Sequence, residues 1–148
     1  MGRLAKLRFM TRREKTCLCE AGILLLLSNA CIKAIAFRHI DRFLRRCWNE
    51  GVRRTVDHKK EISLVQHSIS RAANALPWES LCLNRSVTEY VMLRRRGIPA
   101  VLFAGVRFSG HSSLDAHAWV ETDLINNTSS ENSGFATVIR IGTGGADQ

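Results

Sequence analysis

The sequence lacks the patterns that mark several classes of protein. It has five cysteines, an odd number, with no CxxC pair, and the Cys17–Cys19 spacing does not suit the common zinc motifs. Neither a disulfide framework nor a metal site is indicated, no cofactor is expected, and free thiols fit a reducing cytosol. No internal repeat is present, and a length of 148 residues suits one compact domain.

Acidic residues are few. The chain has 13 Asp and Glu against 22 Lys and Arg, which gives a net charge of +9. Such a balance can indicate nucleic-acid binding. The arginines are scattered over several segments, however, and no zinc-finger, RRM or recognition-helix pattern accompanies them. We therefore expect no nucleic acid, and we expect an acidic peptide or protein as the partner.

Long uninterrupted apolar runs are also missing. The most apolar stretch, residues 17–37, has a continuous core of only Ala21–Leu27, with Glu20, Asn29 and Lys33 breaking the wider window. A spanning helix needs about 20 predominantly apolar residues, and no small-residue cleavage site of a secretory signal follows. The stretch predicts a helix that is buried or faces a partner, with no membrane span and a cytoplasmic location.

Two more helices are predicted in the N-terminal half, at Arg38–Arg46 and Ile62–Ala75, with a charged loop between them. Three histidines lie in or near these segments, and none has ligand spacing to another histidine or to a carboxylate. We interpret them as surface or packing residues: His39, His58 and His67.

The two prolines of the sequence, Pro77 and Pro99, bracket its best-marked helix. Ser80 suits an N-cap. From Leu83 apolar residues recur at spacings of three and four, which is one face of a helix. Three arginines then precede Gly97, a combination typical of a helix C-terminus.

This helix places Cys82 in its first turn. A thiolate there faces unpaired backbone N–H groups and the positive end of the helix dipole, and both stabilise it. A free cysteine is also commonly a small buried side chain. The segments that follow decide between these two interpretations.

Two strands are predicted after the helix. AVLFAGVRF, which starts after Pro99, is almost wholly apolar and predicts a strand buried on both faces. The polar segment Ser109–Leu114 predicts a loop. HAWVET then begins a strand at His117, and Ala136–Ile141 resembles a further short strand.

A hairpin turn near Thr122–Asp123 would bring LINN back alongside His117. In that register His117 lies opposite Asn127 or Thr128, with Cβ atoms about 5 Å apart. Asn127 could then hold one ring nitrogen while the other faces Cys82. Asp115 is the alternative on the same strand face, whereas Asp123 would lie roughly 20 Å along the strand.

The run CLNRSVTEYVMLRRRGIPAVLFAGVR followed by AHAWVE resembles the transglutaminase-like cysteine proteases that remove the leader during bacterial lasso peptide biosynthesis. CL-x-RS, RRRGIPA, GVR and HAWVE occur in the family's order and spacing, over about half of the chain. The resemblance implies that Cys82 is the nucleophile and His117 its base. The family usually has aspartate where this chain has Asn127, and a Cys-His-Asn group is also chemically competent.

The expected fold is α+β, with a papain/transglutaminase-like core in which a cysteine on a helix N-terminus packs on a small antiparallel sheet. Residues 61–148 would form the catalytic core and residues 1–60 an N-terminal helical extension, together making one compact domain. The resemblance implies a precursor leader peptide as substrate. It also implies a separate leader-recognition protein, and an ATP-dependent lasso cyclase that acts on the freed core peptide.

Three functions stay open from the sequence alone. The first is leader removal by a cysteine peptidase. The second is transfer of the acyl group to an amine, as transglutaminases do. The third is a peptide-binding partner of the maturation complex whose catalytic site is degraded, which Asn127 suggests.

Overall fold

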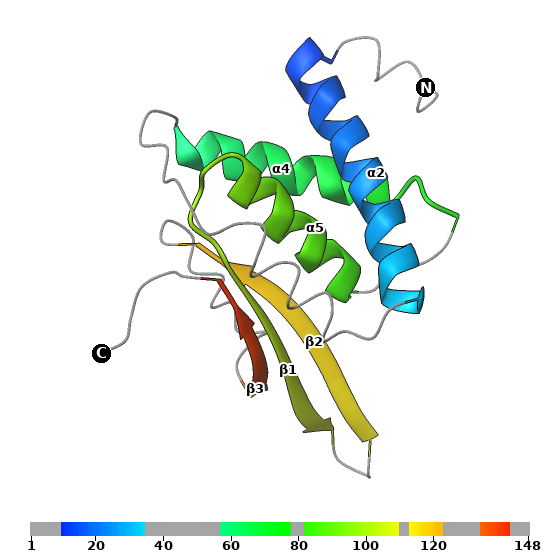
Figure 1. Cartoon of the computed structure of the whole chain (residues 1–148), viewed down its shortest axis with the longest axis vertical. Helices are drawn as coiled ribbons and strands as arrows, with labels where there is room; N and C mark the ends of the chain where they lie inside the picture. The colour runs from blue at the N-terminus through cyan, green and yellow to red at the C-terminus, as the bar shows by residue number, and fades with distance from the viewer. Residues whose placement is uncertain (1–9, 35–56, 78–81, 110–112, 123–133, 143–148) are drawn as a thin grey trace.

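The computed structural model describes residues 10–34, 57–77, 82–109, 113–122 and 134–142. Within these ranges the chain forms three helices and three strands (Figure 1). They are α2 (Arg12–Ala34), α4 (His58–Ala73), α5 (Cys82–Arg95), β1 (Val101–Ser109), β2 (Ser113–Glu121) and β3 (Ala136–Ile141). The helices pack against one another and α5 lies on the sheet, so the α+β architecture predicted from the sequence is confirmed.

The sheet is antiparallel, with strand order β2-β1-β3. Leu102 of β1 pairs with Val120 of β2 and with Ile141 of β3, and all three side chains belong to the core beneath the helices. Because side chains alternate along a strand, Phe103 of β1 and Trp119 of β2 lie on the opposite face. The sheet therefore has one helix-covered face and one face carrying aromatic residues.

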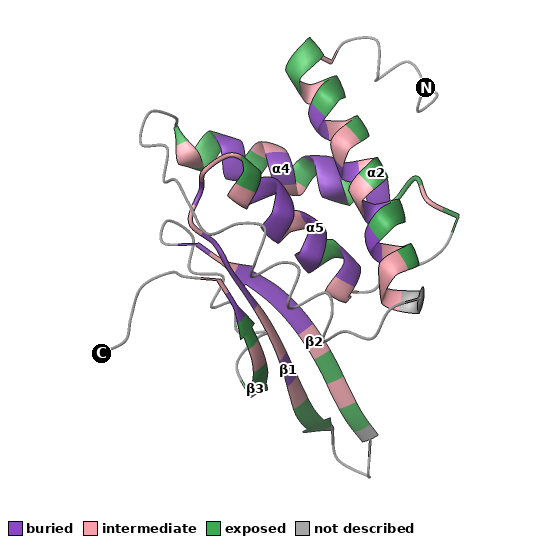
Figure 2. Ribbon diagram, in the orientation of Figure 1, coloured by how far each residue is buried: buried purple, intermediate pink, exposed green. Residues whose placement is uncertain are grey.

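One hydrophobic core joins the helices to the sheet. In Figure 2 the buried residues of each helix face the neighbouring elements, while the outer faces are exposed. The most deeply buried apolar side chains come from all parts of the described chain: Ala21, Leu25, Ile62, Val65, Tyr90, Met92, Leu93, Leu102 and Ile141. Since α2 shares this core, it is an integral part of the packed unit.

The C-terminal end of α5 is closed by local hydrogen bonds. The N–H of Ile98 donates to the carbonyl of Leu93 over 3.1 Å, and the N–H of Gly97 donates to the carbonyl of Arg94 over 3.0 Å. Gly97 has φ 70°, a left-handed conformation that favours glycine. The predicted glycine C-cap is thus confirmed, while Ser80, the predicted N-cap, lies outside the described residues.

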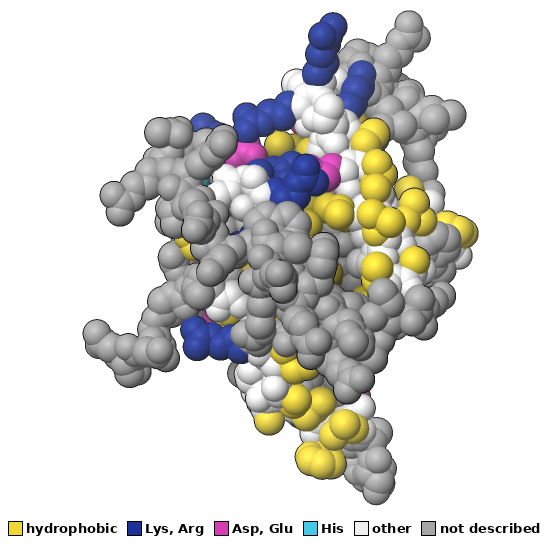
Figure 3. All heavy atoms as spheres, viewed as in Figure 1, with side chains coloured by type: hydrophobic (Ala, Val, Ile, Leu, Met, Phe, Trp, Pro, Cys, Tyr) yellow, Lys and Arg dark blue, Asp and Glu magenta, His cyan; other side chains and the backbone are white. Residues whose placement is uncertain are grey.

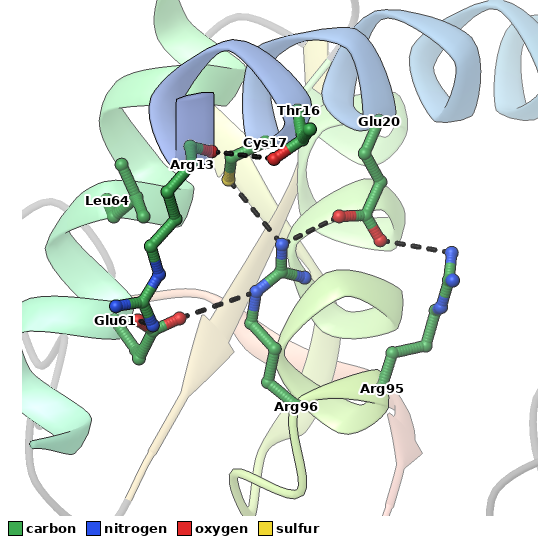
Figure 4. Close-up of a pocket in the computed structure, with 8 residues that line it drawn as sticks. All are labelled: Arg13, Thr16, Cys17, Glu20, Glu61, Leu64, Arg95 and Arg96. Atoms are coloured by element: carbon green, nitrogen blue, oxygen red, sulfur yellow. Dashed lines mark hydrogen bonds and ion pairs between the residues drawn. The ribbon is translucent and has the colours of Figure 1, made fainter. Parts of the chain in front are cut away.

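An ionic cluster holds the three helices together at this same end (Figure 4). The Arg96 guanidinium lies 2.6 Å from the Glu20 carboxylate of α2 and 3.6 Å from the Glu61 carboxylate of α4. Arg95 pairs with Glu20 over 3.0 Å, and Arg13 pairs with Glu61. The cluster lines a pocket of about 340 Å³. This pocket is a full helix length from Cys82, about 20 Å for α5, so it is remote from the predicted nucleophile.

The predicted N-terminal helix is confirmed, and it begins earlier than expected, at Arg12. Its buried face is formed by Cys17, Ala21 and Leu25, while Ile23 and Leu27 on the other side are more than half exposed. By length and composition alone, Arg12–Ile32 is apolar enough to cross a membrane, with a mean hydropathy of 1.5. A signal sequence and the mostly buried core helix of a soluble protein pass the same test. Here 22% of the apolar window is buried, and this buried face packs on α4 and α5.

Two boundaries and the burial of one strand differ from the sequence prediction. α4 begins at His58, so the last part of the predicted charged loop is helical. β2 begins at Ser113, four residues before His117, because β1 pairs with it along its whole length. β1 is not buried on both faces: Phe108 is 83% exposed, since the hairpin end extends beyond the helices. The predicted helix Arg38–Arg46 lies outside the described residues.

Candidate active site

Cys82 is the first residue of α5, as the sequence predicts, and its side chain is half-buried. Its Sγ lies 3.9 Å from the carbonyl oxygen of Ala116 in β2. The first N–H groups of an α-helix have no partner within the helix. A thiolate at Cys82 therefore has backbone donors and the positive end of the helix dipole close to it.

Ser86 fixes the position of this helix end on the strand. Its buried hydroxyl, one turn after Cys82, donates a 2.8 Å hydrogen bond to the carbonyl of Ala118. Cys82 and Ser86 thus contact alternate carbonyls of β2, at Ala116 and Ala118, with His117 between them. The sequence analysis did not single out Ser86, although the i, i+4 spacing to Cys82 puts both side chains on one helix face.

His117 lies in the middle of β2, opposite Gly105 of β1. Strand alternation puts its side chain on the face that Trp119 occupies, while Ala116 and Ala118 point toward α5. The imidazole stacks on the Trp119 indole, with centroids 6.0 Å apart and planes at 17°, and it contacts the Phe135 ring at 5.4 Å. Two aromatic rings therefore restrict the orientation of the imidazole.

Gly105 makes this aromatic group possible. A Cβ at that position would lie 2.9 Å from the Ala136 carbonyl oxygen, 3.2 Å from Phe135 Cβ and 3.3 Å from the Trp119 ring. The absence of a side chain lets both rings close over β1 beside His117. The Arg107 guanidinium covers the Phe135 ring at 4.4 Å from its centroid, a cation–π contact. No local pattern near Phe135 indicated this role, because the contact joins segments far apart in the sequence.

The structure brings Cys82 to the backbone next to His117. Among the residues it describes, the thiol has its polar contact with Ala116, and the imidazole contacts aromatic rings; no hydrogen bond joins the two. Catalytic hydrogen bonds are often long in an unliganded enzyme and shorten when substrate binds. The structure places the helix-terminal thiol against the strand backbone next to His117, while strand alternation directs the imidazole to the face of the sheet away from α5.

The third catalytic residue, which would orient the His117 imidazole, stays a prediction. Asn127 and Asp123 lie outside the described residues. Asp115 shares the strand face of His117, and its carboxylate lies 3.7 Å from the Arg107 guanidinium, with both side chains nearly half exposed. Asp115 is thus already engaged in an ion pair at the surface.

The described residues contain no group of three His, Cys, Asp or Glu side chains that could hold a metal ion. The groups predicted for the candidate site are the Cys82 thiol, the His117 imidazole and the backbone N–H groups at the start of α5. A thiol so placed is suited to nucleophilic attack on an acyl group, with the N–H of Cys82 available to an oxyanion.

Comparisons with curated proteins and with solved structures gave no significant match. A match to a protein family was found over residues 24–140, which spans α4, α5, β1, β2, all but the last residue of β3 and the part of α2 from Leu24 on. Members of that family are typically cysteine-dependent enzymes, of the protease or acyl-transfer type. The cysteine on a helix N-terminus, the antiparallel sheet and the sequence match agree, and the chain belongs to the transglutaminase-like superfamily.

Proposed function

We propose that this chain is a cysteine peptidase that removes the leader from a ribosomally made lasso peptide precursor. The observation that supports the proposal most is the position of Cys82 at the start of α5, against the strand residue that adjoins His117. The HAWVE segment forms the strand that the resemblance to leader peptidases requires.

In the proposed reaction, the Cys82 thiolate attacks the scissile carbonyl and forms a tetrahedral adduct. The amide C–N bond breaks as protonated His117 gives its proton to the leaving amine, which leaves a thioester on Cys82. His117 then takes a proton from water as the water attacks the thioester. The C–S bond then breaks, which releases the acid, ionised to the carboxylate, and returns the Cys82 thiolate with His117 protonated again. The leader and the core peptide thus leave as separate products.

The proposed partners come from the resemblance to the lasso peptide leader peptidases. A precursor leader peptide is the substrate, a separate small recognition protein presents it, and a lasso cyclase uses the freed core peptide. We place these steps in the cytoplasm, where ribosomal precursors are made and thiols stay reduced.

The test is incubation of the purified chain with the precursor peptide encoded beside it, with the products read by mass spectrometry. Wild type is expected to release the leader. Cys82→Ala and His117→Ala are each expected to abolish cleavage with an unchanged circular dichroism spectrum. Cys19→Ala, which removes an exposed thiol from α2, is the matched control and should cleave normally. Cleavage by Cys82→Ala at the wild-type rate would exclude the cysteine mechanism.

Acyl transfer to an amine is the second candidate, because the superfamily supports both types of reaction. The two share the thioester and differ in the group that attacks it. Adding a primary amine to the reaction separates them: a peptidase yields the free carboxylate, whereas an acyltransferase yields the amide, which differs in mass.

A catalytically degraded binding partner is distinguished by thiol reactivity. An active site stabilises the Cys82 thiolate, so a small alkylating probe should label Cys82 far faster than Cys19. Equal labelling of the two cysteines would favour a binding role.

A further inference from the structure

The β1–β2 hairpin carries an exposed apolar pair immediately beyond the candidate nucleophile. Val106 and Phe108 share a face of β1, and their partners on β2 are Ala116 and Leu114. Cys82, where α5 begins, is located at the Ala116 level of this face. The next pair along the hairpin, Phe108 and Leu114, therefore lies past the end of the helix.

These two side chains are among the most exposed large hydrophobic residues of the described chain. Phe108 is 83% exposed and Leu114 is 55% exposed. Figure 1 shows the hairpin end extending beyond the helices, and Figure 3 shows hydrophobic side chains gathered at that end of the molecule. Covering such side chains removes apolar surface from water, which is favourable, so an apolar group that docks here gains affinity.

The pair is close enough to the thiol to contact a substrate. Leu114 is two residues from Ala116, or about 7 Å along the strand, and the thiol lies 3.9 Å from the Ala116 carbonyl. An extended peptide advances by about 3.3 Å per residue. A peptide whose scissile bond lies at Cys82 would therefore place a side chain one to three residues away over this pair.

We propose that Phe108 and Leu114 form a substrate subsite that takes an apolar side chain of the peptide, close to the bond that is cut. The proposal rests on the proposed peptidase function. The continuity of the pair with Cys82 favours the substrate as its occupant. A second copy of the chain is disfavoured, because each copy has a net charge of +9 and would repel the other.

Charge does not oppose an apolar occupant. The charged residues next to the pair along the two strands, Arg107 and Asp115, lie on the other face of the hairpin, where they pair with each other over 3.7 Å. The subsite face of this cross-strand segment therefore presents apolar groups. Specificity would come from the size and apolar character of the substrate side chain. A hydrophobic pocket typically discriminates between side chains that differ by one methylene by about 10–200-fold.

The first experiment measures binding without cleavage. Fluorescently labelled precursor peptide is titrated into Cys82→Ala, alone and combined with Phe108→Ser or Leu114→Ser, and the anisotropy is followed. Each added substitution should raise the Kd by about tenfold or more. Leu26→Ser on α2 is the matched control, because Leu26 is 47% exposed and lies on a different element; its Kd should stay unchanged. Equal Kd values for Leu114→Ser and Leu26→Ser would overturn the subsite.

The second experiment measures turnover in the background with Cys82 intact. Phe108→Ser should raise the KM for the precursor about tenfold, and Phe108→Leu should restore most of the loss. The rate of Cys82 labelling by iodoacetamide should stay at the wild-type value, since that probe needs no subsite. If wild type binds the precursor more tightly than Phe108→Ser does but never cleaves it, the peptidase function fails while the apolar binding site stands. If wild type cleaves and Phe108→Ser has a normal KM, the subsite fails alone.

Discussion

A cysteine–histidine pair works best when a third side chain holds the imidazole in one tautomer. In this chain the Trp119 and Phe135 rings restrict the imidazole plane of His117. Neither ring can accept a hydrogen bond from the imidazole N–H as a carboxylate or an amide oxygen does. The sequence predicts that Asn127 fills this role. Asp115, its alternative, is paired with Arg107.

The two candidates are separated by substitution. Asn127→Ala should lower the cleavage rate at least tenfold, because the ring loses its fixed tautomer, about 1.4 kcal/mol or more in the barrier. Asn127→Asp should keep or raise activity, since a carboxylate makes a stronger, charge-assisted hydrogen bond. Asp115→Asn should change the rate little. A normal rate for Asn127→Ala together with loss of activity in Asp115→Asn would assign the role to Asp115 instead.

Glu89 is a residue whose environment predicts a pH effect on stability. Burial raises the pKa of this half-buried carboxyl, and the hydrogen bond from Gln66 Nε2, at 2.9 Å, lowers the pKa and offsets this in part. Folding therefore disfavours the charged form. The contribution of Glu89 to stability is fully present below its ordinary pKa of 4.5 and is lost as the pH rises through the raised value.

Glu89→Gln should consequently melt at a higher temperature than wild type near neutral pH, with the difference disappearing at acidic pH. The oxygen of the new amide can still accept the bond from Gln66, so the packing contact is kept. Glu14→Gln is the control of opposite sign, because hydrogen bonds from the Thr11 backbone N–H and then its hydroxyl lower the pKa of Glu14. The measurement is calorimetry over a pH series. Melting of the Glu89→Gln variant below wild type at neutral pH would contradict this expectation.

At the scale of single elements, α2 combines two different apolar faces. Leu25 is 1% exposed and packs in the shared core, while Leu26, its neighbour in sequence, is 47% exposed. Only part of the apolar surface of this helix is therefore buried in the core. The rest faces outward beside the ionic cluster, as Figure 3 shows for the visible side of the molecule.

Leu25→Asp and Leu26→Asp form a matched pair that tests this division. Leu25→Asp should lower the free energy of unfolding by about 3–5 kcal/mol, because it removes a buried side chain and places a charge among apolar groups. Leu26→Asp should change it by about 0.5 kcal/mol or less. Urea unfolding followed by circular dichroism measures both. Equal costs would mean that the outer face of α2 is also packed in solution.

The sequence predicted the ends of helices and strands where nearby residues determine them, and failed where contacts with distant segments determine them. The C-terminal end of α5 was predictable, because Gly97 and the preceding arginines act within one turn. The start of β2 was not, since Ser113–Ala116 become a strand only by pairing with Val106–Ser109 of β1. For the site, Cys82 was located correctly on its helix, whereas the Phe135 ring beside His117 depends on a contact between distant segments.

At the scale of the whole molecule, the net charge of +9 has to be reconciled with a packed fold. Some arginines are neutralised internally: Arg95 and Arg96 pair with Glu20, and Arg107 pairs with Asp115. Such pairs orient the helices and the hairpin, yet they leave the overall charge unchanged. A molecule with this charge attracts acidic partners over a range set by the ionic strength.

If the substrate is an acidic precursor, the charge should act mainly on the rate of encounter. Raising the salt concentration from about 0.1 M to about 1 M shortens the screening length from about 10 Å to about 3 Å. The kcat/KM for the precursor should then fall about tenfold, carried largely by association. A precursor with its leader acids changed to amides is the control, and its smaller kcat/KM should vary little with salt. Iodoacetamide is uncharged, so its rate of reaction with Cys82 should also stay nearly constant. An equal fall for both precursors would show that salt weakens the active site itself, and no fall for either would show that the charge serves another partner.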